Sequence, residues 1–100
     1  MAKRGKKDQE KHDAVVRREA NKLKREGWNV EADIPGFDKP KPIGKDQKVP
    51  DIRAIKAGAE KIIEVETPDT IEKDKDQQAT FRRRAGQKQR TSFEVIETDD

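Results

Sequence analysis

Residues 49–66 read VPDIRAIKAGAEKIIEVE, with an alternating apolar and polar segment on each side of Ala57-Gly58. Alternation with a period of two is typical of a β-strand, and a small pair such as Ala-Gly suits the tight turn of a hairpin. The sequence therefore predicts one strand over residues 49–56 and a second over residues 60–67.

The turn also predicts the register of this hairpin, because a loop with an even number of residues fixes which residues face each other. The expected pairs are Ile55 with Glu60, Arg53 with Ile62, and Asp51 with Glu64. Side chains alternate between the faces of a strand, so the apolar ones gather on a single face. That face comprises Ile52, Ala54, Ile63 and Val65.

The other face gathers three acidic side chains, Asp51, Glu64 and Glu66. Directly opposed residues in a hairpin have Cβ atoms about 5 Å apart, and like charges that close repel unless a proton or a cation lies between them. Hard oxygen ligands of this kind suit Mg²⁺ or Mn²⁺, whose bound water can attack a phosphodiester. The alternative is that the acids form the solvated face of an exposed hairpin.

The segments around the hairpin predict two helices and two further strands. Apolar residues at three- and four-residue spacing predict the helices, and alternation and clustered prolines predict the strands and a long loop. The expected elements are a helix over 9–25, a strand over 28–34, a loop over 35–50, a helix over 70–88 and a strand over 91–97. The order αβββαβ predicts an α/β fold with a mixed four-stranded sheet flanked by two helices.

Length and composition exclude several classes of protein. The chain has 100 residues, 24 Lys and Arg against 21 Asp and Glu, and only 29% hydrophobic residues, which predicts one domain with a thin core. The chain has no cysteine and a single histidine, His12. A zinc hydrolase or a Ser-His-Asp triad would have to be built around that residue, and nothing near it has the spacing that these sites require. We expect a flexible basic arm at residues 1–8 and a single domain at 9–100. No signal peptide or membrane span is visible, so a cytoplasmic, intracellular location is expected.

Val49-Pro50-Asp51, twelve intervening residues and then Glu64-Val65-Glu66 resemble the motif of the PD-(D/E)xK nuclease superfamily. The resemblance extends over most of residues 9–97. The run LKREGW at residues 23–28 makes archaeal Holliday junction resolvases and restriction-endonuclease-like proteins the most similar members. The resemblance to this superfamily implies a restriction-endonuclease-like core and the activity of a Mg²⁺- or Mn²⁺-dependent DNA endonuclease. Asp51, Glu64 and the carbonyl of Val65 are the implied metal ligands.

The third position of the motif departs from the family, because Glu66 stands where the family usually has lysine. That lysine usually orients the attacking water and stabilises charge. Some restriction endonucleases are similar to this chain in carrying glutamate there. A lysine could also reach in from elsewhere, and the nearest in sequence are Lys48, Lys73 and Lys75.

The first helix departs as well, because Val16 stands where the family usually offers a metal-side glutamate. Glu19 and His12 lie on the same helical stripe and are the candidates to replace it. A lone histidine on such a stripe is more often a packed or surface residue. In the second helix, Gln77 or Gln78 resembles a glutamine that faces the active site in several of these nucleases. Gln78 is preferred because it lies on the stripe that includes Phe81, and the alternative is a partly buried helix glutamine.

Basic residues are the candidates for contacts with nucleic acid. No acidic residue occurs between Phe81 and Arg90, and such clusters are an obvious surface for phosphates, although charge runs are often only solvated. The predicted DNA-binding residues are Lys45, Lys48, Arg82, Arg83 and Lys88. A nuclease that cuts two strands would be a homodimer. The competing hypotheses are a non-catalytic DNA-binding module on the same fold and a protein-interaction domain.

Overall fold

The order of helices and strands is the one expected from the sequence. A computed structural model describes residues 6–68, 70 and 74–98. The elements are α1 (Lys6–Arg25), β1 (Asn29–Ala32), β2 (Ile52–Lys56), β3 (Ala59–Glu66), α2 (Lys75–Gln87) and β4 (Thr91–Glu97). The predicted α/β fold with two helices is therefore confirmed.

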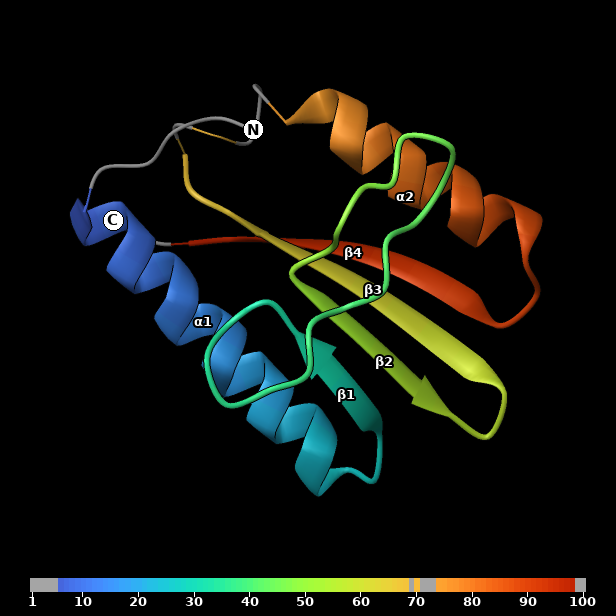
Figure 1. The fold of residues 1–100 in the computed structure, drawn as a ribbon, viewed down its shortest axis with the longest axis horizontal. Coiled ribbons are helices and arrows are strands. Elements are labelled where there is room, and N and C mark those ends of the chain that lie inside the picture. Colours follow the sequence, from blue (N-terminus) through green and yellow to red (C-terminus); the bar gives the residue numbers. More distant parts are fainter. Residues whose placement is uncertain (1–5, 69, 71–73, 99–100) are drawn as a thin grey trace.

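The four strands form one mixed sheet in the order β1-β2-β3-β4 (Figure 1). The pairs β1-β2 and β2-β3 are antiparallel, and β4 runs parallel to β3. Ala57 and Gly58 have φ angles of 49° and 84°, the left-handed conformation that a two-residue hairpin turn requires. The predicted pairs Ile55 with Glu60 and Arg53 with Ile62 are confirmed.

Two of these strands are shorter than predicted. β1 spans four residues rather than the seven of 28–34, and β2 begins at Ile52 rather than at residue 49. Pro50 explains the later start of β2, because proline has no backbone N–H to donate to a neighbouring strand. Asp51 therefore lies just before the paired part of β2, where strict alternation no longer dictates the direction of its side chain.

The two helices cover opposite faces of the sheet. Ile63 belongs to the core cluster that includes Val16, Ala20 and Leu23 of α1. Its neighbour Ile62 belongs to the second cluster, with Phe81 of α2. Because adjacent residues of a strand point to opposite faces, α1 and α2 lie on different sides. Figure 1 shows α1 next to β1 and α2 next to β4, in agreement with the contacts between these elements.

Helix α1 starts earlier than expected and ends as expected. It begins at Lys6, so residues 6–8 of the predicted arm are helical; residues 1–5 lie outside the described part of the chain. At the other end Gly27 has a φ of 92°, and the N–H of Trp28 donates to the carbonyl of Leu23 over 3.0 Å. A left-handed glycine of this kind is a common way to end a helix. Neither α1 nor α2 is long and apolar enough to cross a membrane.

Helix α2 begins at Lys75 rather than at Thr70, and its N-cap is Asp74. Thr70, where the predicted helix starts, is held in a turn instead. The backbone N–H of Thr67 donates to Oγ1 of Thr70, and that hydroxyl also donates to the Glu66 carboxylate. Asp69 and residues 71–73, including the candidate Lys73, lie outside the described residues.

Phe81 is the main apolar residue that packs α2 on the sheet. Its side chain is fully buried and its ring centroid lies 5.8 Å from that of Phe93. We expect Phe81→Ala to lower the free energy of unfolding by about 3 to 5 kcal/mol, measured by urea denaturation. Phe81→Leu keeps most of the apolar volume and is the control. A decrease below about 1 kcal/mol for the alanine variant would contradict this packing of α2.

Candidate functional site

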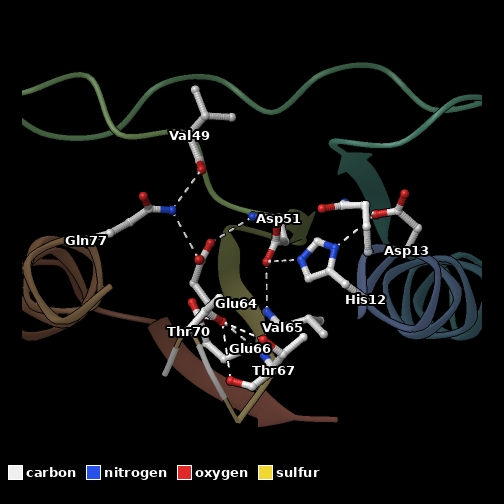
Figure 2. Close-up of polar contacts among 11 residues, drawn as sticks. His12, Asp13, Val49, Asp51, Glu64, Val65, Glu66, Thr67, Thr70 and Gln77 are labelled. Atoms are coloured by element: carbon white, nitrogen blue, oxygen red, sulfur yellow. Dashed lines mark hydrogen bonds and ion pairs between the residues drawn. The ribbon is translucent and has the colours of Figure 1, made fainter. Parts of the chain in front are cut away.

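Two hydrogen bonds join Asp51 to Glu64 and Val65 at the point where β2 and β3 part (Figure 2). The backbone N–H of Asp51 donates to Oε1 of Glu64 over 2.9 Å. The backbone N–H of Val65 donates in return to Oδ2 of Asp51 over 2.8 Å. These bonds extend the contact between the two segments past the regular register, so the expected proximity of Asp51 and Glu64 is confirmed.

Each of the two carboxyl groups is also contacted by a helix. His12 of α1, which is only 4% exposed, places its Nε2 atom 3.1 Å from Oδ2 of Asp51. Gln77 of α2 donates to Oε2 of Glu64 over 3.1 Å and to the carbonyl of Val49 over 3.3 Å. Figure 2 shows the His12 ring on one side of the acidic pair and Gln77 on the other. Both helices therefore take part in positioning the pair.

The other nitrogen of the His12 ring also faces a carboxylate. Nδ1 lies 2.9 Å from Oδ1 of Asp13, whose side chain is 40% exposed. His12 is thus placed between an exposed acid of its own helix and the partly buried Asp51. This arrangement fixes the orientation of the ring, since both nitrogens have a carboxylate within hydrogen-bonding distance.

Burial and neighbouring acids keep a proton on Glu64. Burial, and then the charge of Asp51, raise the pKa of Glu64 to about 10, and Glu66 and Asp74 add smaller contributions. The hydrogen bond from the Asp51 backbone acts in the opposite direction. At neutral pH this carboxyl is therefore neutral unless a cation replaces its proton.

Glu66 lies on the same side of β3 as Glu64, and its side chain is fully buried. The Oγ1 hydroxyl of Thr70 donates to Oε2 of Glu66 over 2.6 Å, and the Thr67 hydroxyl lies 3.1 Å from the Thr70 hydroxyl. The prediction that Glu64 and Glu66 share a face is confirmed. The carboxyl of Glu66 is engaged by the turn that leads to α2.

The acids do not assemble into a full set of metal ligands by themselves. Within residues 6–68, 70 and 74–98, no group of three or more His, Asp or Glu side chains has an arrangement that would hold a metal ion. Mg²⁺ nevertheless usually takes only one or two protein carboxylates and keeps several waters. Asp51 and Glu64 are two such carboxyl groups, and a cation between them would relieve the repulsion that helps to raise the pKa of Glu64.

The remaining candidates occupy different positions. Val16 is buried in the core, Glu19 is half-buried, and His12 is the helix-one candidate that contacts Asp51. Gln77 contacts Glu64, although the sequence favours Gln78; Gln78 is buried on the same helix. Among the lysines considered as replacements, Lys48 is half-buried and Lys75 is exposed.

The predicted DNA-binding residues divide into two sets. Lys45, Arg83 and Lys88 line one pocket between the loop at residues 43–45 and α2. Arg82 instead lies over the ring of Phe93, 5.4 Å from its centroid, and Lys48 pairs through its backbone with Ile43.

Fold and site together define an α/β protein with a four-stranded mixed sheet, two helices and a buried acidic pair where β2 and β3 part. Comparisons of the chain with protein-family models, curated proteins and solved structures found no match.

Proposed function

We propose that this chain is a Mg²⁺- or Mn²⁺-dependent DNA endonuclease of the PD-(D/E)xK type, which hydrolyses phosphodiester bonds in branched or otherwise structured DNA. The observation that carries this proposal is the pair of hydrogen bonds that ties Asp51 to the Glu64-Val65 segment. The raised pKa of Glu64 supports it, because a buried acid beside a second acid favours a cation.

In this proposal Asp51, Glu64 and the carbonyl of Val65 hold the metal ion. The ion would supply an activated water and neutralise charge on the phosphate. The chain's own residues keep the ligands in place: His12 orients Asp51 from α1, and Gln77 orients Glu64 from α2. Side chains that orient a metal ligand usually matter nearly as much as the ligand.

A non-catalytic DNA-binding module on the same fold is the second candidate. It is favoured by Glu66, which stands in the lysine position and whose buried carboxylate accepts a hydrogen bond from Thr70. Val16 in the core supplies no acid from helix α1 either. Under this alternative, DNA binding depends on salt but survives the removal of the Asp51 carboxylate.

A cleavage screen separates the two candidates. Junction, flap, nicked and linear DNA are incubated with Mg²⁺ or Mn²⁺ and either the wild type or Asp51→Ala. We expect metal-dependent products with the wild type and none with the variant. DNA binding by both proteins without any cleavage would support the second candidate instead.

Gln77 provides a further test of the site. Gln77→Ala removes the side-chain donor to Glu64, and we expect cleavage to fall by about 10- to 100-fold, the usual effect of removing a residue that orients a metal ligand. The exposed Gln89→Ala, two residues after the end of the same helix, is the matched control. Equal cleavage rates for the two variants would show that Gln77 has no role.

A homodimer belongs to the proposal because cutting two strands requires two sites. Sedimentation equilibrium of the wild type, alone and with junction DNA, measures the number of chains in each particle. We expect two chains per junction, whereas one chain per cleaved duplex would remove the dimer from the proposal.

A further inference from the structure

A basic pocket of about 280 Å³ lies between the loop at residues 43–45 and α2. Among the described residues that line it, none is acidic, and four are basic: Lys45, Arg83, Arg84 and Lys88. The loop and the helix are far apart in the sequence, so the pocket is a product of the fold. Neither the acidic pair nor its supporting residues line it.

The loop that forms one side of the pocket is held in place by core packing and by backbone hydrogen bonds. Ile43 is buried in the core with Phe81, and two backbone hydrogen bonds of 2.7 and 2.9 Å join it to Lys48. Gly44 has a φ of 80°, and a Cβ atom there would lie 2.8 Å from Cγ2 of Thr80. Glycine therefore permits the close approach of this loop to α2 that forms the pocket.

The charge of the pocket is only partly balanced within the protein. Arg84 donates two hydrogen bonds to Glu60, at 2.9 and 3.1 Å. Burial would raise the pKa of Glu60, but Arg84 and Arg53 outweigh it and lower this pKa, so the partner of Arg84 is ionised. Of the basic residues in the pocket, Arg84 is the one paired with a carboxylate among the described residues. The surplus positive charge of the other three favours an anion.

The arrangement along α2 favours a polymer of phosphates over one small anion. Thr80 and Arg84 lie one turn apart on the same side of α2, and Lys88, the C-cap residue after the helix, extends this stripe to about 12 Å. Phosphates of one strand advance by about 3.4 Å along a duplex, so this stripe is long enough to meet more than one of them.

The pocket is also held at a fixed distance from the acidic pair. Gln77 contacts Glu64 and Arg84 contacts Glu60, so α2 is fastened to β3 at two points. Glu60 and Glu64 are four strand residues apart, which is about 13 Å. A strand of DNA that places one phosphate at the acidic pair would therefore bring the phosphate about four nucleotides away to the pocket.

We propose that this pocket binds the backbone of duplex DNA about three to four nucleotides from the bond to be cut. The distance from the cut bond rests on the proposed function. Binding of duplex DNA by the pocket does not depend on it. Lys45, Arg83 and Lys88 contact the phosphates, while Arg84 keeps α2 in place.

The test compares two double variants that remove the same charge. Arg83→Gln with Lys88→Gln changes the pocket, and Lys22→Gln with Arg25→Gln changes exposed residues in the last turn of α1. Affinity for a labelled duplex is measured by fluorescence anisotropy with Ca²⁺ at several salt concentrations. We expect the pocket variant to bind at least about tenfold more weakly and its salt slope to fall by about 0.9 for each phosphate that the variant no longer neutralises. The α1 variant should bind nearly as the wild type does.

The outcomes separate this inference from the proposed function. Equal affinities for both double variants, with cleavage that still depends on Asp51, would overturn the proposal that the pocket binds DNA but not the proposed nuclease function. DNA binding that is weakened by the pocket variant, without cleavage by any protein tested, would support the binding role of the pocket and overturn the proposed nuclease function. No duplex binding by the wild type would overturn both. Circular dichroism of each variant confirms that the fold is intact.

Discussion

Asp51→Asn is expected to reduce metal-dependent DNA cleavage by at least about 100-fold, since removing a residue that merely orients a metal ligand already costs about 10- to 100-fold. The substitution keeps the size of the side chain and an oxygen that can accept the hydrogen bond from Val65. It removes the negative charge that a divalent cation requires. The rate of product formation at saturating Mg²⁺ or Mn²⁺ measures the effect, and a thermal melt shows whether the variant is folded.

Asp13→Asn is the matched control for this experiment. Asp13 lies beside the other nitrogen of the same His12 ring, and asparagine at this position keeps a side-chain oxygen next to Nδ1, so the ring keeps its orientation. We expect this variant to retain most of the activity. If Asp51→Asn cleaves as fast as Asp13→Asn, then Asp51 is no metal ligand and the proposed function is wrong.

The second large effect is a decrease in stability as the pH rises in the absence of divalent cations. The pKa of Glu64 is raised from 4.5 to about 10 in the folded protein. Between these values the folded state holds a proton that the unfolded state releases, so the free energy of unfolding falls with pH. The slope approaches about 1.4 kcal/mol per pH unit. We therefore expect the protein to lose about 2 to 3 kcal/mol between about pH 5.5 and 7.5, as measured by urea unfolding in EDTA.

Glu64→Gln is the control, because glutamine has the same shape and no proton to lose. Its stability should change little over this range, so the two curves should separate as the pH rises, with the wild type losing stability relative to the variant. Glu60 does not interfere, because its pKa is lowered and its contribution is lost only on acidification below its usual range. A wild-type curve parallel to that of Glu64→Gln would show that Glu64 is ionised in the folded protein.

The order of elements and the hairpin register were predictable because they follow from short-range patterns. Alternating residues define β2 and β3, and the left-handed turn at Ala57-Gly58 sets their pairing. The proximity of Asp51 and Glu64 was predicted by continuing that register one pair beyond Ile52 and Ile63, and two hydrogen bonds hold the segments together there. The start of α2 was less predictable. The sequence pattern allows a helix to begin at Thr70, but in the fold the Thr70 hydroxyl donates a hydrogen bond to Glu66.

Contacts between distant elements could not be derived in the same way. The contact of His12 with Asp51 depends on how α1 packs across the sheet, and helical spacing alone fixes only which side of α1 is buried. The choice between Gln77 and Gln78 has the same origin, because a small rotation of α2 decides which glutamine reaches Glu64. Sequence patterns did not reveal the pairing of Glu60 with Arg53 and Arg84, although the register places Glu60 near Arg53 on the sheet.

The most direct test of the acidic pair is titration of the protein with Mn²⁺ by isothermal calorimetry near neutral pH, in buffers of different ionisation enthalpy. We predict uptake of one ion per chain with release of about one proton, because the cation must displace the proton that Glu64 holds. Asp51→Asn and Glu64→Gln should both abolish this uptake. Absence of Mn²⁺ binding by the wild type, or binding that both variants retain, would contradict a metal site at Asp51 and Glu64.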